Sequence, residues 1–391
     1  REVIISSRLH SNGHRFFNLI FFKEETQNKF FIFEAMKNKK LNIFLAILFA
    51  FQIVFVQLIS KYPSFVEHYY SNGIYRFTSI LLRFLFGWIP FSFGDLLIGI
   101  LVFISIRFIY RLFKDKFKNL KSKLLQVIAF LSILYSCFYW FWGFNYFREP
   151  LAKNLGFQQT KYTTAQLVKV SENIIKRLNE THFSITKNDS LVAKNPHSRK
   201  EMYKMAIAGY DNLMYEYPQF EYNFKSVKSS LMSLLQSYNG TSGYFNPITG
   251  EAQVNDRIPV NGYPTTVCHE MAHQLGIAAE NEANFVGYLA ALSNDDDYFK
   301  YAAYRMAFSY LISEVRKHNK AIFNKLILSV NKGILIDFKE SSEFWNQYRN
   351  PIEPLIKKGY NSYLKANKQV NGIQSYNYVV DLIISYENQY N

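Results

Sequence analysis

The sequence predicts a mainly α-helical membrane protein in which three transmembrane helices precede an α+β domain. Two observations lead to this prediction. Apolar residues are concentrated in long runs within the first 150 of the 391 residues, whereas later segments carry apolar residues at helical spacing. One later stretch, Ser237 to Val254, separates short apolar pairs by turn residues, which is typical of a pair of short strands.

Three apolar runs are candidates for membrane spans: Leu41 to Ser60, Phe91 to Ile109 and Leu124 to Phe144. Each approaches the roughly 20 residues that an α-helix needs to cross the hydrocarbon core. Buried helices of a soluble core are also apolar, but the aromatic ends and flanking charges of these runs favour membrane spans. We therefore expect residues 36–147 to form a three-span anchor and residues 148–391 to form one domain.

Basic residues flank these runs unequally. Lys37, Lys39 and Lys40 precede the first run, and seven Lys or Arg residues lie at the connection between the second and third, whereas the first connection carries three. The positive-inside rule then places the N-terminus and the second connection in the cytoplasm. We expect a multi-pass protein of a bacterial inner (plasma) membrane with an extracytoplasmic C-terminal domain. The net charge of +15 partly reflects these anchoring residues, so the lipid bilayer is an expected partner and nucleic acid is not.

The segment before the first run looks like a translation start. Met36 is followed by Lys37-Asn38-Lys39-Lys40, so residues 1–35 are interpreted as a doubtful N-terminal extension and are given no function. Because no small-residue cleavage site follows the first run, we expect that run to be an uncleaved anchor.

Two features near the second run have a structural interpretation. Ile80 to Trp88 is apolar but too short to span a bilayer, and it is predicted to be an interfacial helix. Asp95 follows Pro90 and Gly94 just inside the second run. It is either a helix-capping residue or a functional acid within the membrane, and we favour the cap.

The later part of the chain is expected to be largely helical. Helical periodicity predicts helices at about Thr164 to Leu178, Lys200 to Tyr215, Tyr298 to His318, Ser342 to Ala366 and Tyr376 to Tyr390.

One five-residue motif points to chemistry. His269-Glu270-Met271-Ala272-His273 reads H-E-x-x-H, and on an α-helix residues i and i+4 share one face, so both imidazoles can bind one ion. The glutamate between them is placed to take a proton from an attacking water, as in zinc peptidases. Imidazole ligands suit Zn²⁺. A chance occurrence on a surface helix is the alternative, but the apolar neighbours of the motif favour a buried helix.

A catalytic zinc site with two His ligands needs a third protein ligand. On an unbroken helix Glu280 would lie roughly 10 Å beyond His273, so the helix must end and the chain must fold back. Gly276 is the expected stop because glycine accepts the left-handed conformation that closes a helix. Either Glu280 or Glu282 is then a candidate ligand, and the alternative is that both only stabilise the start of the next helix.

The motif and the residues after it resemble the gluzincin metallopeptidases. The ImmA/IrrE-like and CAAX-prenyl-protease-like families carry a second motif, E-x-x-A-N or E-x-x-A-D, which is matched here by Glu280, Ala283 and Asn284. The resemblance implies a zincin-like domain in which Glu280 is the third ligand. Only six residues separate the two motifs, fewer than in those families, so Glu282 stays an alternative. Over about residues 36–385, the chain also resembles an uncharacterised family of bacterial envelope proteins of unknown function.

Two further sets of residues are candidates for supporting catalysis. Gly243 to Gln253 is the candidate strand edge for binding a substrate backbone, and an ordinary surface hairpin is the alternative. Tyr301, Tyr304 and Arg305 are candidates for stabilising the oxyanion, although a packing role is favoured for the tyrosines.

These features together predict a membrane-anchored zinc metallopeptidase. His269, His273 and Glu280 would bind Zn²⁺, Glu270 would act as the general base, and the substrate would be an extracytoplasmic peptide or protein. One alternative is a non-catalytic zinc-stabilised envelope module that binds a partner, and another is a zinc amidase acting on peptidoglycan stem peptides. Glu270 argues against the first alternative, because a structural zinc site needs only ligands. The sequence does not specify an oligomeric state.

Overall fold

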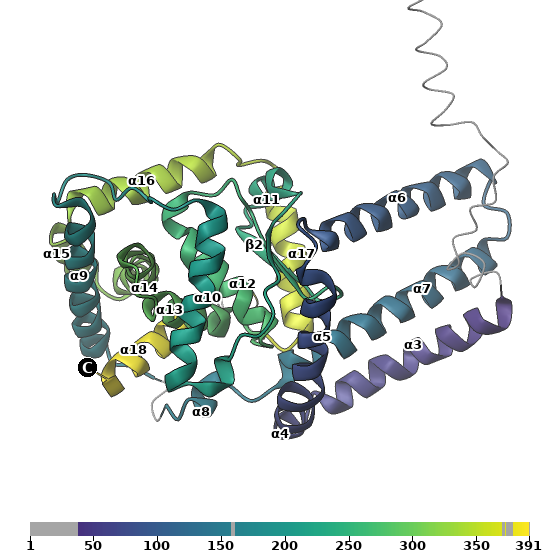
Figure 1. Cartoon of the computed structure of the whole chain (residues 1–391). Helices are drawn as coiled ribbons and strands as arrows, with labels where there is room; N and C mark the ends of the chain where they lie inside the picture. Colours follow the sequence, from purple (N-terminus) through teal and green to yellow (C-terminus); the bar gives the residue numbers. More distant parts are fainter. Residues whose placement is uncertain (1–37, 158–160, 370–371, 373–377, 391) are drawn as a thin grey trace, which may run out of the picture. The chain divides into compact units, whose positions relative to one another are not determined.

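The computed structural model describes residues 38–157, 161–369, 372 and 378–390 (Figure 1). The N-terminal extension interpreted from the sequence, residues 1–35, lies outside the described residues. The described chain is mainly helical, as predicted. It forms two compact units: the first contains residues up to Phe51 together with Asn119–Ile133, and the second contains Gln52–Lys118 together with Leu134–Asn391.

Among the described residues, three helices are long and apolar enough to cross a membrane, which confirms this part of the prediction: α3 (Lys39–Ile59), α6 (Phe93–Lys114) and α7 (Leu120–Phe141). The 22 residues of α6 correspond to roughly 33 Å at 1.5 Å per residue, close to the thickness of a bilayer core. Within α6 the buried residues are Gly94 and Asp95, both in its first turn. The rest of this apolar helix therefore needs lipid or a protein partner around it.

The predicted interfacial helix is part of a longer helical connection between α3 and α6. This connection consists of α4 (Pro63–Phe65), the π-helix η1 (Val66–Ile74) and α5 (Tyr75–Gly87). α5 is amphipathic. Its solvent-exposed stripe continues past its end and contains Phe77, Leu81, Phe84 and Trp88, at helical spacing. An exposed apolar stripe of this kind is typical of a helix that lies on a membrane surface.

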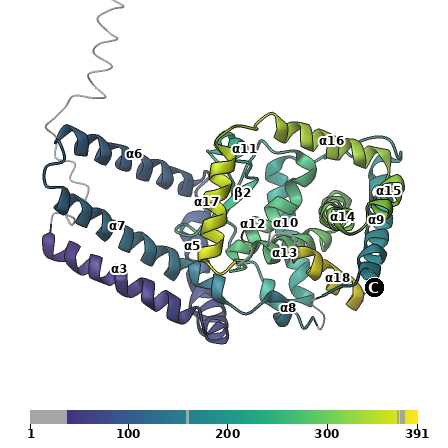
Figure 2. The same ribbon diagram turned by 180° about the vertical axis from the view of Figure 1, so that it is seen from behind.

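Most of the remaining elements are helices, and the majority of these contribute side chains to one hydrophobic core (Figures 1 and 2). They are η2 (Gly143–Phe147), α8 (Leu151–Asn154), α9 (Thr164–Thr186), α10 (Arg199–Glu216), η3 (Pro218–Phe220), α11 (Ser233–Asn239), η4 (Val260–Gly262), α12 (Tyr263–Gln274), α13 (Glu280–Leu292), α14 (Asp297–His318), α15 (Lys320–Leu328), α16 (Lys332–Asn346), α17 (Glu353–Ala366) and α18 (Val379–Tyr390). The helix expected at Ser342 to Ala366 is thus divided between α16 and α17. The break contains Pro351, and proline disfavours helix at the residue before it.

In the part of the chain that the structure describes, one small sheet accompanies the helices. Its strands are β1 (Val227–Ser229), β2 (Gly243–Asn246) and β3 (Glu251–Val254), in the order β1-β3-β2. β2 and β3 form the predicted pair of short strands and are antiparallel. β1 adds a parallel strand that the sequence pattern did not indicate, so β3 is the central strand. β2 is therefore an edge strand of a three-stranded sheet, and the sheet packs against α12.

Candidate metal centre

α12 carries both histidines of the motif and ends where the sequence predicts. Gly276 has a φ of +82°, in the left-handed region, and the N–H of Ile277 donates to the carbonyl of Ala272 at 3.2 Å. These contacts close the helix and turn the chain. α13 then begins at Glu280, so the turn brings the start of the second helix back beside the histidines.

The structure brings His269, His273 and Glu280 together. The two Nε2 atoms lie 3.1 Å apart. Oε2 of Glu280 lies 3.3 Å from Nε2 of His269 and 3.6 Å from Nε2 of His273. One ligand atom from each of the three side chains lies within 4.8 Å of the others. Two imidazole nitrogens and one carboxylate oxygen that converge in this way are a donor set suited to a catalytic zinc ion, which leaves one coordination position for water or substrate.

Hydrogen bonding and charge make this cluster complementary to a cation. Nδ1 of His273 lies 2.7 Å from the carbonyl oxygen of Ile277, and because that oxygen only accepts, Nδ1 carries the proton and Nε2 faces Glu280. Burial lowers the pKa of His273, but the charges of Glu280 and Glu270 outweigh it and raise this pKa to about 9. Burial raises the pKa of Glu280, and the neighbouring histidines more than reverse that effect. A metal ion would replace the proton that His273 otherwise holds.

Glu270 lies buried beside this cluster. Burial raises the pKa of its carboxyl, the two histidine charges oppose that rise, and Glu280 adds to it. Among the residues that the structure describes, Oε2 of Glu270 has no hydrogen-bond partner. A buried carboxylate oxygen without a partner carries a desolvation cost, and it is free to accept a proton from a bound molecule.

Glu282, the alternative ligand, lies outside the cluster. Its Oε1 accepts a hydrogen bond of 2.7 Å from the backbone N–H of Leu151, the first residue of α8. Burial raises the pKa of Glu282 to about 7. The geometry therefore favours Glu280 over Glu282 as the third ligand, and it gives Glu282 a structural contact instead.

Tyrosines that the sequence reasoning did not identify surround Glu280. The hydroxyl of Tyr360, in α17, donates to Oε1 of Glu280 at 2.6 Å. The ring of Tyr360 stacks on that of Tyr363, whose hydroxyl lies 3.2 Å from the hydroxyl of Tyr146. Burial and the charge of Glu280 raise the pKa of Tyr310 to about 12. Tyr360 thus orients the carboxylate through its other oxygen, as outer residues commonly do for metal ligands.

The residues considered for oxyanion stabilisation make other contacts. The hydroxyl of Tyr301 donates to Asp337 at 2.7 Å, and Arg305 pairs with the same carboxylate at 2.8 Å. Tyr304 interacts with Arg177 and Glu387. These contacts favour the packing role for all three, and Tyr360 is the hydroxyl that the structure places at the cluster instead.

The edge strand β2 runs beside Glu270. A Cβ atom at Gly243 would lie 2.7 Å from Oε1 of Glu270, so the strand approaches the carboxylate as closely as glycine allows. The carbonyl of Ser242 accepts from the N–H of Asn255 at 2.9 Å, and the antiparallel alternation then directs the backbone groups of Gly243 and Phe245 away from β3. Those groups form the outer edge of the sheet.

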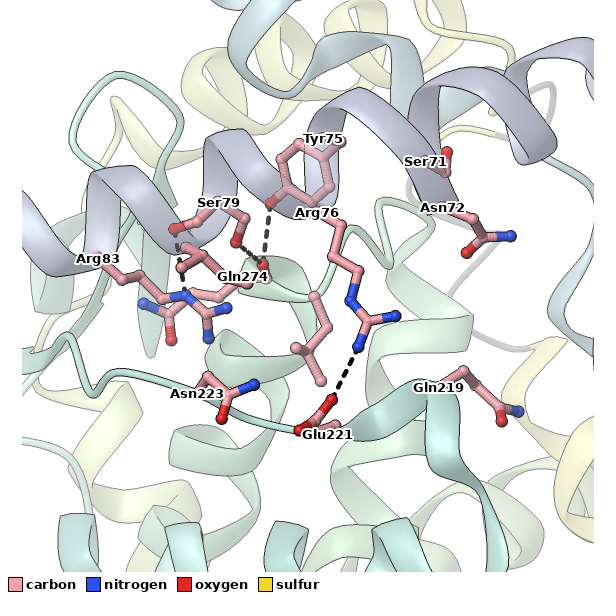
Figure 3. A pocket seen from close by; sticks show the side chains of 12 residues that line it. Ser71, Asn72, Tyr75, Arg76, Ser79, Arg83, Gln219, Glu221, Asn223 and Gln274 are labelled. Carbon is pink, nitrogen blue, oxygen red and sulfur yellow. Dashed lines mark hydrogen bonds and ion pairs between the residues drawn. The ribbon is translucent and has the colours of Figure 1, made fainter.

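The far end of α12 contacts α5. The hydroxyls of Tyr75 and Ser79 donate to the carbonyl of Gln274 at 3.0 and 2.6 Å (Figure 3). A polar cavity of about 160 Å³ lies at this junction, with Arg83 and Glu221 among its lining residues. It is lined by residues other than the cluster, so it is a neighbour of the candidate metal centre and not part of it.

Comparison with known protein families identifies the chain only at the level of a family. Residues 70–384 match the family described as "Protein of unknown function (DUF3810)". The chain belongs to this family. The matched segment begins in η1 and ends in α18, so it contains the whole cluster together with α6 and α7. No curated protein and no solved structure matches the chain. This membership agrees with the predicted resemblance to an uncharacterised family.

Proposed function

We propose that this DUF3810 member is a membrane-anchored zinc-dependent peptidase that cleaves extracytoplasmic peptides or proteins. The observation that carries the proposal is the convergence of His269, His273 and Glu280 beside the unpartnered carboxylate oxygen of Glu270. A purely structural metal site requires no such free carboxylate. The buried position of the cluster on two packed helices also favours a site whose geometry is held for catalysis.

The residues have distinct roles in this proposal. His269, His273 and Glu280 would hold Zn²⁺, which supplies a Lewis acid for the peptide carbonyl and lowers the pKa of water. Glu270 takes a proton from the attacking water and passes it to the departing amine. His273 is held in one tautomer by the carbonyl of Ile277, and Tyr360 holds Glu280.

The edge of β2 supports a peptide as the substrate. The outward backbone groups of Gly243 and Phe245 can pair with an extended chain, as strands do in β-augmentation. Such a chain would lie along the strand whose glycine contacts Glu270, so its carbonyl groups would run past the general base.

Charge distribution supports an extracytoplasmic position for this site. The basic connection after α6, including Lys114, Lys116 and Lys118, lies at the end of α6 opposite to the buried Gly94 and Asp95. The positive-inside rule assigns the basic end to the cytoplasm. The end that contacts the sheet would then face the cell exterior or the periplasm.

The proposal is tested with the full-length protein in proteoliposomes. Glu270→Gln should keep its bound zinc and lose on the order of 10² to 10⁴ in the rate of hydrolysis of a mixed peptide library. Glu343→Gln, at an exposed position of α16, is the matched control and should keep both its bound zinc and its rate of hydrolysis. Zinc is measured by mass spectrometry and cleavage by the appearance of new amino termini. Full activity of Glu270→Gln, or a wild-type protein that purifies without zinc and hydrolyses nothing when zinc is added, would overturn the proposal.

A further inference from the structure

The residue that follows α7, the third apolar helix, contacts α12 directly. Trp142 comes immediately after α7, and its indole N–H donates to the carbonyl of His273 at 2.9 Å. Its ring stands edge-on to the imidazole of His273, with the ring centres 5.8 Å apart. The centre of the same indole ring lies 5.2 Å from the centre of the Phe245 ring in β2. One side chain at the end of a membrane helix thus contacts both a candidate zinc ligand and the edge strand.

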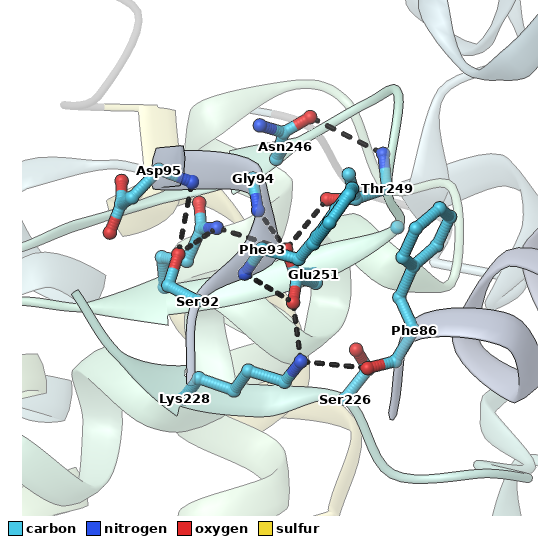
Figure 4. Close-up of polar contacts among 12 residues, drawn as sticks. Phe86, Ser92, Phe93, Gly94, Asp95, Ser226, Lys228, Asn246, Thr249 and Glu251 are labelled. Carbon is cyan, nitrogen blue, oxygen red and sulfur yellow. Dashed lines mark hydrogen bonds and ion pairs between the residues drawn. The ribbon is translucent and has the colours of Figure 1, made fainter. Parts of the chain in front are cut away.

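The start of the second membrane helix contacts the sheet (Figure 4). The carboxylate of Glu251, in β3, accepts from the backbone N–H groups of Phe93 and Gly94 at 3.2 and 2.5 Å. This carboxylate also pairs with Lys228 of β1. An anion at this position stabilises the positive end of the α6 dipole. The sheet therefore holds the first turn of α6 through buried charge.

Asp95 extends this contact to the edge strand. Its carboxylate accepts from Ser230 and from the N–H of Leu231, both at 2.8 Å, and from the hydroxyl of Tyr244 in β2. The prediction that Asp95 caps the helix is wrong. The N-cap is Ser92, whose hydroxyl accepts from the N–H of Asp95. Asp95 lies in the first turn of the apolar helix and joins it to the strand that borders Glu270.

The amphipathic helix α5 contacts the C-terminal end of α12. Tyr75 and Ser79 bond to the last carbonyls of α12 (Figure 3). Phe77 and Trp88, on the exposed stripe, are 75% and 77% exposed. Aromatic rings at this level are typical of the boundary between the bilayer and water. The helix that carries the exposed aromatic stripe is therefore hydrogen-bonded directly to the helix that carries His269 and His273.

These contacts hold the candidate site close to the first turn of the apolar helix α6. Asp95 is the third residue of α6, so it lies about 3 Å from the start of the apolar helix. One tyrosine side chain then spans the distance from Asp95 to the backbone of β2. An extended chain covers roughly 3.3 to 3.6 Å per residue, so about three to six residues suffice to connect a membrane anchor to a peptide lying along β2.

We propose that the substrate is the extended segment that directly adjoins a membrane anchor, as in the juxtamembrane stretch of another integral membrane protein. This inference rests on the peptidase function proposed above. A segment of this kind leaves the bilayer at the level of β2 and pairs with the outward backbone groups of Gly243 and Phe245. A folded soluble protein would have to bring an extended loop down to the membrane surface, against the exposed rings of α5.

The experiment compares one cleavable sequence in three settings. A randomised ten-residue segment is placed directly after a transmembrane anchor, or after the same anchor with a folded spacer domain of about 30 Å in between, or in a free peptide. Each is incubated with the full-length protein in proteoliposomes, and Glu270→Gln is the inactive control. We expect the directly anchored segment to be cleaved at least tenfold faster than the same segment above the spacer. The first cuts should lie within about six residues of the anchor.

The outcomes separate the inference from the proposed function. Equal cleavage in all three settings, abolished by Glu270→Gln, would overturn the membrane-proximal substrate and leave the peptidase function standing. If the wild-type protein cleaves none of them, the peptidase function is contradicted. A binding assay then tests whether the site prefers the membrane-proximal segment. A photoreactive residue introduced as Phe245→p-benzoylphenylalanine should still crosslink to the directly anchored segment in preference to the spaced one. Absence of that preference overturns the inference as well.

Discussion

The carboxylate of Glu270 occupies the space that a side chain at Gly243 would fill. A Cβ atom at position 243 would lie 2.7 Å from Oε1 and 2.9 Å from Cγ of Glu270. Gly243 opens the edge strand β2, and Glu270 lies between the two histidines of α12. The proposed general base and the proposed substrate strand are therefore positioned by direct contact with each other.

Gly243→Ala should reduce catalysis without removing the metal. The added methyl group forces either the carboxylate of Glu270 or the strand to move, and a displacement of about 1 Å in an active site typically costs on the order of 10²-fold in rate. We expect that loss in kcat/KM with an unchanged zinc content. Gly99→Ala is the matched control, because a Cβ at Gly99 meets no atom within 4 Å, and it should be fully active. An active Gly243→Ala variant would contradict the close contact as a determinant of catalysis.

Glu280 and Glu282 should respond differently to removal of their carboxylates. Glu280→Ala deletes one of three converging ligand atoms and should lose most of the bound zinc. Glu282→Ala removes the acceptor for the N–H of Leu151, so it should keep zinc and lose on the order of 1 kcal/mol of stability. The zinc content and the melting temperature of both variants show which glutamate is the third ligand. Zinc loss in Glu282→Ala alone would reverse the assignment.

Tyr360→Phe should weaken zinc binding while leaving all three ligands in place. Its hydroxyl donates to Oε1 of Glu280, and loss of such a partner typically costs 10- to 100-fold in metal affinity. Competition with a fluorescent chelator measures the affinity. Tyr215→Phe changes a tyrosine that is 83% exposed, and it should leave the zinc affinity unaltered. Equal affinities of Tyr360→Phe and the control would exclude a role for the hydroxyl.

The part of the candidate site that lies close together in sequence was predictable. A motif at helical spacing, a glycine that ends the helix and a glutamate four residues later are local features, and each lies where the sequence indicates. The membrane helices were predictable for a similar reason, since length and apolar composition suffice.

The missed features depend on contacts between distant segments. Tyr360 lies 80 residues from Glu280 in the sequence. It belongs to α17, and the hydrophobic periodicity did not show that α17 is a helix separate from α16. β1 has three residues, too few for an alternating pattern, and it forms because β3 offers it a free edge. Asp95 was assigned to a local cap because its partners Ser230 and Tyr244 lie more than 130 residues away.

Reporter fusions test the proposed topology. A reporter after Lys118, in the basic connection between α6 and α7, should behave as cytoplasmic, and a reporter at Asn391 should behave as exported. Alkaline phosphatase and a fluorescent protein that matures only in the cytoplasm provide complementary signals. A cytoplasmic signal from the C-terminal fusion would invert the topology and remove the extracytoplasmic substrate from the proposal.

The last prediction concerns stability and Asp381, a half-buried residue of α18. Burial is the main reason that its pKa is raised from the usual value of 3.8 to about 6, and the charge of Glu314 adds to the rise. Tyr162 lies against the same pair of carboxyls. Because the folded state binds this proton more tightly than the unfolded state, the contribution of Asp381 to stability falls as pH rises from about 4 to about 6. Above pH 6 the folded protein holds an unfavourable charge.

Asp381→Asn should therefore stabilise the protein at pH 7 and have little effect at pH 4. A shift of about two pKa units corresponds to at most about 3 kcal/mol, and partial exposure to water reduces this to roughly 1 kcal/mol. For a domain of this size we expect an increase in Tm of about 2 to 4 °C at pH 7. Thermal melts of the wild type and the variant across pH 4 to 7 measure the difference, with Asp211→Asn as the exposed control. A Tm difference that stays constant across this range would show that titration of Asp381 is not its cause.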